Sequence, residues 1–148
     1  MVEVRPGKPN PADPKRKKLV IIGSREFSKL DLVRKLVEAL PPDDWTIVSG
    51  GARGVDRTAE QAAIERGIPI ISIPADWSKG RDAGIIRNSA IVELADIVIA
   101  FWDRRSRGTM DVIVKARSAE KPLTIYYPET VAGDMLLDTA EMVRGQWP

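Results

Sequence analysis

The sequence predicts an α/β protein with three layers: a mostly parallel sheet of about five strands, covered by helices on both faces. Two observations predict it. Short runs of β-branched residues, too short for helices, alternate along the chain with amphipathic segments of helical length. The first run, residues 18–22 (KLVII), is apolar throughout and ends at Gly23, as is typical of a buried parallel strand. With 148 residues, 43% of them hydrophobic, the chain can bury one sizeable core.

The first strand is followed by a predicted helix over residues 31–40. Ser28 is a candidate N-cap, and Pro41 with Pro42 ends the helix because proline cannot continue the backbone ladder. Five apolar residues recur at helical spacing and should share one face: Leu32, Val33, Leu36, Val37 and Leu40.

The second unit is a strand over 45–49, a glycine-rich loop and a helix that ends at Arg66, with Gly67 as its C-terminal cap. A third strand is expected over 68–73, then a long polar loop and a helix over 83–95. The apolar face of that helix should be formed by Ile86, Ala90 and Leu94. The remaining elements are expected in the order strand 96–102, helix 109–120, strand 123–127 and helix 132–143.

The positive charge of the chain is concentrated at its N-terminus. Residues 1–18 hold six basic and two acidic groups, so the rest of a chain of net charge +2 carries −2. Four prolines in the same segment oppose both helix and sheet. We therefore expect residues 1–17 to form a flexible basic leader, and residues 18–148 to form a single domain. The KRKK run at 15–18 could contact nucleic acid or serve only as a solubilising leader.

The absence of cysteine and histidine narrows the chemistry. Thiolate nucleophiles, disulfides, Cys/His zinc sites and imidazole bases are excluded, which leaves carboxylates, hydroxyls, Lys, Arg, Tyr, backbone amides or a hard cation such as Mg²⁺. No apolar run approaches the ~20 residues that a membrane span needs, and no secretory signal is visible. We expect a cytoplasmic location and no membrane partner.

Three loops that follow predicted strands combine small residues, an arginine and the start of a helix, at residues 23–25, 49–56 and 106–109. Helix N-termini and exposed amides favour anions, and guanidinium groups donate to phosphate or carboxylate. Because the carboxyl ends of parallel strands meet at one edge of a sheet, the loops should converge on a phosphate-bearing ligand. The candidate ligand-binding residues are Gly23, Ser24, Arg25, Ser49, Gly50, Gly51, Ala52, Arg53, Gly54, Asp56, Ser106, Arg107, Gly108 and Thr109.

Each of the other candidate residues near this edge has two alternative roles. Asp56 could hold a ligand or cap the second helix. Arg87 and Asn88 could face the ligand or lie on a solvated surface, and Trp77 and Trp102 could stack on a base or pack at the rim. The loop cations Lys79, Arg81, Arg104 and Arg105 are expected to be lid or surface charges.

Neither the G-x-G-x-x-G nor the G-x-x-x-x-G-K-[ST] fingerprint occurs. The ordered motifs present are GSREF at 23–27, SGGARGVD at 49–56, PADW at 74–77, Arg87-Asn88, ADIVIAFW at 95–102 and SRGT at 106–109. Together they resemble the SLOG superfamily, and most closely its YspA-like branch. The resemblance implies a Rossmann-like fold, a pocket for nucleotides or nucleotide-derived ligands, and pairing of copies into a homo-oligomer through helices. The superfamily includes the LOG phosphoribohydrolases, molybdenum-cofactor carrier proteins and DNA-processing DprA proteins.

The sequence departs from the LOG enzymes at their P-G-G-x-G-T-x-x-E motif, where Val112 stands in place of the glutamate that assists cleavage. Binding or sensing of a nucleotide-derived phosphate ligand is therefore the first hypothesis. The alternative is a nucleotide N-glycosidic hydrolase with Asp56, Asp103 or Asp111 as the catalytic carboxylate. A DprA-like single-stranded DNA-binding protein, which would use the basic leader and the tryptophans, ranks third because the remaining chain is slightly acidic. No metal site is predicted, and a requirement for Mg²⁺ is left open.

Overall fold

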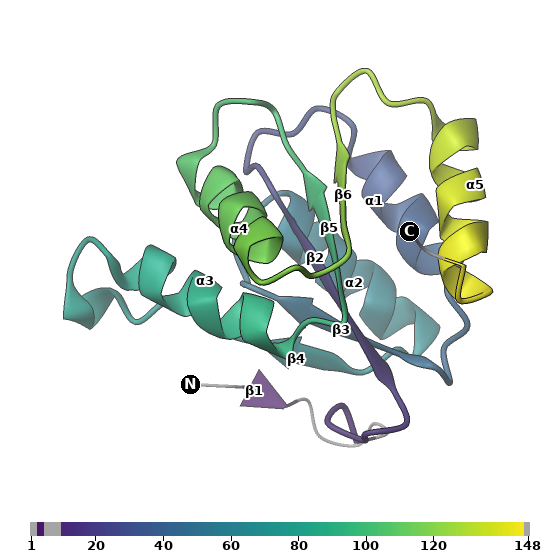
Figure 1. Ribbon diagram of the computed structural model, residues 1–148, viewed down its shortest axis with the longest axis horizontal. Helices are drawn as coiled ribbons and strands as arrows, with labels where there is room; N and C mark the ends of the chain where they lie inside the picture. Colours follow the sequence, from purple (N-terminus) through teal and green to yellow (C-terminus); the bar gives the residue numbers. More distant parts are fainter. Residues whose placement is uncertain (1–2, 5–9, 147–148) are drawn as a thin grey trace.

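The computed structural model describes residues 3–4 and 10–146 and confirms the three-layer α/β fold (Figure 1). The strands are β1 (Glu3–Val4), β2 (Lys17–Gly23), β3 (Trp45–Ser49), β4 (Ile70–Ser72), β5 (Ile97–Phe101) and β6 (Leu123–Tyr126). The helices are α1 (Leu30–Glu38), α2 (Val55–Arg66), α3 (Ala83–Leu94), α4 (Arg107–Ser118) and α5 (Ala132–Val143), with a short 3₁₀ helix, η1 (Trp77–Lys79).

The sheet has the order β1-β4-β3-β2-β5-β6. Strands β2 to β6 are parallel, as predicted, and β1 adds an antiparallel edge strand beside β4. The central strand β2 pairs on both sides, with Leu19 opposite Ile47 of β3 and opposite Ile97 of β5. The direction of winding reverses at β2, so the loops after β2, β3 and β5 emerge side by side at the carboxyl edge.

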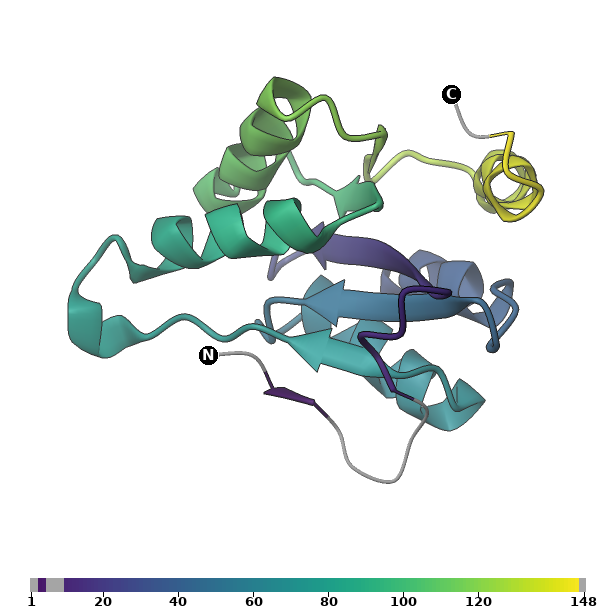
Figure 2. The same cartoon turned by 60° about the horizontal axis from the view of Figure 1, so that its bottom comes forward.

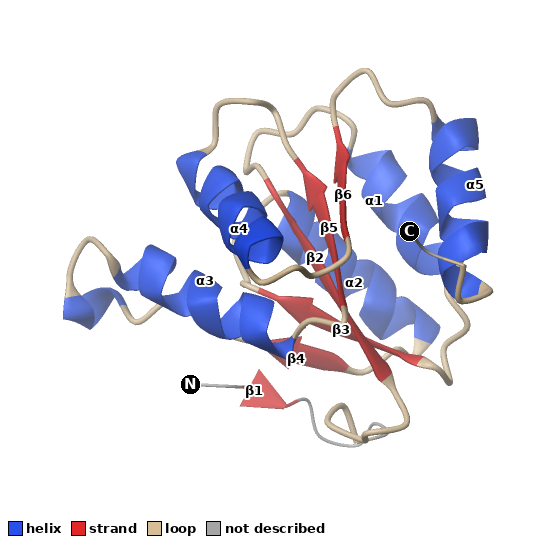
Figure 3. Cartoon of the chain, viewed as in Figure 1, coloured by secondary structure: helices blue, strands red, loops and turns tan. Residues whose placement is uncertain are grey.

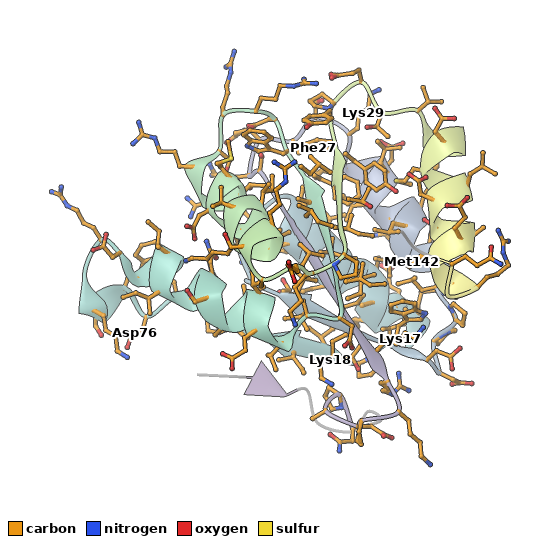
Figure 4. The ribbon with its side chains drawn as sticks, in the orientation of Figure 1. Lys17, Lys18, Phe27, Lys29, Asp76 and Met142 are labelled. Carbon is orange, nitrogen blue, oxygen red and sulfur yellow. The ribbon has the colours of Figure 1, made fainter. Side chains whose placement is uncertain are left out.

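Two apolar cores lie on the two faces of this sheet. Helices α1, α2 and α5 enclose one core, in which Met142 of α5 is fully buried (Figure 4). Helices α3 and α4 enclose the other, through Ile91 of α3 and Ile113 of α4. Figures 2 and 3 show α3 and α4 together on one side of the strands. The central strands are buried on both faces, which explains why their sequences are continuously apolar rather than alternating.

Helix α3 packs by a different face from the predicted one. Ile86 and Ala90 are exposed, and the buried residues are Ala83, Asn88, Ile91 and Val92. The prediction of an inward face is wrong for Ile86 and Ala90, whereas Leu94 is partly buried and packs against the core. Periodicity alone does not decide the inner face because apolar residues occur on both sides of this helix.

The start of α1 also differs from the prediction. Its N-cap is Lys29, without a side-chain cap, rather than Ser28. The C-terminal cap of α2 is confirmed, because Gly67 takes a left-handed conformation with φ of 71°.

Part of the segment before β2, which the sequence predicts to be a flexible leader, is bonded to the domain. Residues 10–16 fold against the domain: Thr46 Oγ1 donates to the Pro11 carbonyl at 2.9 Å, and Arg16 is buried. The Arg16 guanidinium donates to the carbonyls of Pro42 and Trp45, at 2.9 and 2.6 Å. A basic side chain thus serves as an internal hydrogen-bond donor. The leader's residues 1–2 and 5–9 lie outside the described part of the chain.

Within the described ranges, 3–4 and 10–146, no helix is both long and apolar enough to cross a membrane.

Candidate functional site

A cavity of about 630 Å³ opens at the carboxyl edge of the sheet, between the loops after β2, β3 and β5 and the N-terminal end of α3. This volume is typical of small-ligand sites. The predicted site residues that line it are Gly23, Arg25, Ala52, Arg53, Asp56, Trp77, Arg87, Asn88, Asp103, Ser106, Arg107, Gly108 and Thr109. The three loops therefore converge in space as the parallel topology predicts.

The other predicted site residues support the loops from behind and are not among those that line the cavity: Ser24, Ser49, Gly50, Gly51, Gly54, Trp102 and Asp111. Ser24 is buried, and its Oγ accepts from the Asp103 amide at 3.1 Å, which joins the first loop to the third. Ser49 is also buried and donates to Glu60 Oε2 at 2.8 Å.

Glycine is favoured at positions 54 and 50 because other protein groups lie close to the backbone there. Gly54 has φ of 80°, and a Cβ there would meet the Arg25 carbonyl oxygen at 2.6 Å. A Cβ at Gly50 would lie 2.8 Å from Arg87 Nη1 and 2.9 Å from Asp56 Oδ2. The glycines of the second loop therefore allow other protein groups to approach its backbone.

Asp56 connects the first two loops. Only 1% of the residue is exposed; its Oδ1 accepts from the Gly23 amide at 3.2 Å, and its Oδ2 accepts from the Ala52 amide at 3.4 Å. Burial raises the pKa of Asp56 from 3.8 to about 7, although the two amides and the Arg87 charge act in the opposite direction. Asp56 bonds across the site, and the N-cap of α2 is Gly54, so the alternative in which Asp56 caps this helix is wrong.

The expectation that exposed loop amides bind phosphate needs correction, because many of these amides already have protein partners. Gly23 and Ala52 donate to Asp56, and Gly51 donates to Ser49 Oγ at 3.1 Å. In the third loop, the amides of Arg105 and Ser106 donate to Asp103 Oδ1 at 2.8 and 2.9 Å, and Thr109 donates to Ser106 Oγ. The cationic side chains of the cavity are consequently more available to an anion than these amides.

Asp103 holds the third loop in its turn. Burial raises the pKa of its carboxyl, but the hydrogen bonds from the Ser106 and Arg105 amides and from Ser24 lower it further, so that the net pKa lies below the ordinary value. A carboxylate that is ionised and occupied in this way is a poor general base.

Two predicted site residues have structural roles outside the cavity. Trp102 Nε1 donates to the Ser106 carbonyl at 3.1 Å, and its ring packs beside Tyr127, with the ring centres 6.3 Å apart. Asp111 pairs with Lys115 at 2.8 Å and accepts from Asn88 Nδ2 at 3.0 Å. The alternative of rim packing thus describes Trp102, and Asp111 joins α4 to α3.

Arg87 and Asn88 lie on the inner side of α3. Arg87 donates to the carbonyls of Gly50 and Ile73, at 2.6 and 3.0 Å, and through Nε to Asn88 Oδ1. Asn88 in turn donates to the Gly108 carbonyl at 3.3 Å. The pair binds the second and third loops to α3, so the alternative of a solvated surface is wrong.

Six arginines line the cavity: Arg25, Arg53, Arg81, Arg87, Arg105 and Arg107. Only three carboxyl groups line it with them, those of Glu26, Asp56 and Asp103. Arg53 pairs with Glu26 at 2.9 Å. In the described part of the chain, the guanidinium groups of Arg25, Arg81, Arg105 and Arg107 have no ion pair or hydrogen bond. The site therefore carries excess positive charge that is free to meet a ligand.

Arg81 and Arg105, which the sequence predicted to be lid or surface charges, both line the cavity. A signal for Arg105 was available, because it lies between the predicted site residues Asp103 and Ser106. No sequence signal placed Arg81 at the cavity, because its position depends on how the loop with η1 folds back over Gly84. Trp77 is the first residue of η1. It is 59% exposed, and a Cβ added at Gly84 would lie 3.4 Å from its ring.

The described residues contain no group of three or more acidic side chains placed to hold a metal ion. No curated protein matches the sequence.

Solved structures show the same fold. The chain is 23% identical to DNA processing protein A from Helicobacter pylori, studied for its single-stranded DNA binding mode, with a TM-score of 0.57 over 100% of this chain and 90% of that chain. It is 21% identical to DNA processing protein A (DprA) from Streptococcus pneumoniae, with a TM-score of 0.65 over 89% of this chain and 57% of that one. The molybdenum cofactor binding protein from Rippkaea orientalis is 21% identical, with a TM-score of 0.64 over 90% and 88% of the two chains.

These neighbours confirm the Rossmann-like α/β fold. At the level of sequence, the model of a family described as DNA recombination-mediator protein A matches residues 7–83, which contain the first two cavity loops. Because this match spans just over half of the 148 residues, the chain belongs to the DNA recombination-mediator protein A family.

Proposed function

We propose that the chain binds a nucleotide or nucleotide-derived ligand in the cavity at the carboxyl edge of its sheet, with the ligand's phosphate held by arginine side chains. The observation that carries the proposal is the set of cavity arginines without a protein partner among the described residues, Arg25, Arg81, Arg105 and Arg107. Guanidinium groups match phosphate oxygens with paired donors, and these four arginines are exposed, so their donors are accessible to a ligand.

Trp77 supports a ligand that carries a base. Its ring lines the same cavity and is mostly exposed, supported on one side by Gly84. Aromatic rings that are held in place and open on one face are suited to base stacking. A phosphate at the arginines and a base at Trp77 would use both parts of the cavity.

The hydrolase alternative has less support. Of the three carboxyl groups in the cavity, Glu26 pairs with Arg53, Asp56 accepts from two amides, and Asp103 accepts from two more. None of them is placed as a free base beside the arginines, and Asp111 is not among the cavity residues.

The test is isothermal titration calorimetry with AMP, ADP-ribose and adenosine. We expect AMP or ADP-ribose to bind at least tenfold more tightly than adenosine, which lacks phosphate. The double variant Arg25→Ala/Arg105→Ala should weaken phosphate-ligand binding by tenfold to about a hundredfold, as the loss of one or two charged hydrogen bonds predicts. Arg144→Ala, an exposed arginine at the end of α5, is the matched control and should bind as the parent does.

Failure of every ligand to bind at millimolar concentration would overturn the proposal, and so would unchanged affinity in the double variant.

Single-stranded DNA is the second candidate ligand, favoured by membership of the recombination-mediator family. Its phosphates and bases present the same chemistry, and Arg25, Arg53, Arg81, Arg105 and Arg107 are all exposed where a strand could follow them. Fluorescence anisotropy with a labelled oligo-dT tests it directly. Displacement of the oligonucleotide by AMP would show that both ligands share the cavity, whereas no rise in anisotropy at low salt would exclude this candidate.

A further inference from the structure

Arg104 occupies an unusual backbone conformation in the third cavity loop. Its φ is 69°, and among the described residues only Arg104 and Glu120 have a positive φ without being glycine. This left-handed region is uncommon for residues with a side chain and favours glycine or asparagine. Glu120 lies just beyond the end of α4, where such a conformation commonly closes a helix. Arg104 has no helix to close, so we looked for the reason in its contacts.

The side chain of Arg104 lies outside the cavity that its neighbours line. Asp103 and Arg105 both line the cavity, whereas Arg104 does not. The amides of Arg105 and Ser106 donate to Asp103 Oδ1, so the backbone turns around this carboxylate immediately after Arg104. The turn therefore leaves the Arg104 guanidinium free to make contacts away from the cavity.

Two residues of the loop after β6 hold the Arg104 side chain. The guanidinium lies over the ring of Tyr127, 4.1 Å from the ring centre, and pairs with the carboxyl of Glu129. The hydrogen bond from Arg104 lowers the pKa of Glu129, and the charge of Lys29 acts in the same direction. More than half of each paired side chain is exposed, so the ion pair alone is weak. Stacking on the ring adds a second interaction to the same guanidinium.

The loop after β6 is closed by its own hydrogen bonds. The Tyr127 amide donates to Thr130 Oγ1 at 2.9 Å, and the Thr130 amide donates to the Tyr127 carbonyl at 3.0 Å, with Glu129 inside the turn. The Tyr127 ring also packs beside Trp102, whose amide donates to the Tyr126 carbonyl at 2.8 Å. This turn is thus a fixed support beside the third cavity loop.

We propose that Arg104 is a positioning residue for the cavity: Tyr127 and Glu129 hold it from outside, and this keeps the third loop in the conformation that presents Arg105 to a phosphate. We name Arg104, Tyr127 and Glu129 the outer clamp. The clamp touches no ligand and acts by ordering the loop before a ligand binds, which reduces the entropy lost on binding. Its effect on affinity rests on the proposed function, whereas its effect on the order of the loop does not.

The first experiment measures NMR relaxation of the backbone amides in the full chain without ligand. Arg104→Gly removes the clamp side chain but keeps the left-handed backbone, which glycine adopts freely. The order parameters of Arg105 and Ser106 should fall from about 0.85 towards about 0.6. The melting temperature should stay close to that of the parent, because relief of the backbone strain offsets the added freedom of the unfolded chain. Glu129→Gln should lower the same order parameters by a smaller amount.

The second experiment is calorimetry with AMP. Arg104→Gly should weaken AMP binding by about threefold to tenfold, because the loop must then be ordered during binding. Arg104→Lys keeps the charge but not the flat stacking group, so its affinity should lie between those of the parent and Arg104→Gly. The double variant Arg104→Gly/Glu129→Gln should bind no more weakly than Arg104→Gly, because both changes break the same contact.

Arg34→Ala is the matched control. It removes an arginine that pairs with Glu65 between α1 and α2, outside the cavity, and it should match the parent in both experiments. Order parameters in Arg104→Gly equal to those of the parent overturn the proposal, whether or not AMP binds. Unchanged AMP affinity in Arg104→Gly, or additive losses in the double variant, overturn it as well. A parent that binds no AMP counts against the proposed function, and the order parameters then decide on the clamp alone.

Discussion

Asp56 shows how one buried side chain can organise a site without facing a ligand as a free acid. Its carboxyl accepts from the amides of Gly23 and Ala52 and so fixes the first loop to the second. Burial raises its pKa to about 7, close to neutral pH. The protonation state of the site therefore changes in the range where the protein would be studied.

This pKa predicts a pH dependence of folding. An unfolded aspartate has a pKa near 3.8, so between pH 4 and 7 the folded chain holds a proton that the unfolded chain releases. The contribution of Asp56 to stability is complete below pH 4 and is lost as the pH rises through 7. The free energy of unfolding should fall by up to about 1.4 kcal/mol per pH unit in this range.

Urea denaturation of the parent and of Asp56→Asn from pH 4.5 to 8 measures this effect. The asparagine variant lacks the titrating group, so its stability should be flatter with pH. Parallel pH profiles for the two proteins would contradict the assignment.

Gly54 is a residue of the second cavity loop that should tolerate little change. Gly54→Ala should lower the free energy of unfolding by roughly 2–4 kcal/mol, because φ is 80° and the new Cβ would clash with the Arg25 carbonyl. Gly133→Ala is the control: it lies in α5 with nothing within 4 Å of the added carbon, and it should be neutral or stabilising by up to about 1 kcal/mol. Equal effects in chemical denaturation would refute the steric argument.

At the scale of elements, the segment before β2 is attached through hydrogen bonds to the start of β3 and to the loop before it. Arg16 supplies donors to two carbonyls there, and the Pro11 carbonyl receives the Thr46 hydroxyl. The segment thus covers the amino edge of the sheet, opposite the cavity.

We predict that Arg16→Ala costs about 2–3 kcal/mol of unfolding free energy, since a buried carbonyl and a part-buried carbonyl lose a charged donor. Lys15→Ala, whose side chain is exposed, should change stability by no more than about 0.5 kcal/mol. Guanidinium denaturation compares the two, and a loss in Arg16→Ala no larger than that in Lys15→Ala would show that the anchor is unimportant.

At the scale of the whole molecule, the net charge is small but the positive charges are clustered in one place. The chain has a net charge of only +2, yet six arginines meet at one edge of the sheet. An anionic ligand is attracted by this local field, which matters more for binding than the total charge.

If single-stranded DNA is a ligand, its affinity should fall with salt, and each arginine that contacts a phosphate should contribute about 0.7 to the slope of log K against log salt. Arg25→Ala should reduce the slope by about that amount, while Arg144→Ala should leave it unchanged. A slope identical to the parent's in Arg25→Ala would remove that residue from the phosphate contacts.

Local pattern determined much of this protein. The lengths and periods of the apolar runs predicted each parallel strand and helix to within a few residues. This was possible because the burial of core strands and amphipathic helices is visible in their pattern of apolar residues. Parallel topology then predicted that the loops with Arg25, Arg53 and Arg107 would meet, as the cavity confirms. The short β1 strand and the attachment of Arg16 had no such local signal.

Only the tertiary structure decided which polar groups remain free. Helix α3 is apolar on two sides, so packing against α4, with Asn88 bonded to Gly108 and Asp111, selected its inner face. The loop amides expected to meet phosphate bond to carboxyl groups instead: Asp103 accepts from two amides of its own loop, and Asp56 accepts from Ala52 of its own loop and from Gly23 of another. Hydrogen-bond partners are set by proximity in space, which the sequence does not state, and for that reason the residues available to a ligand emerged from the fold.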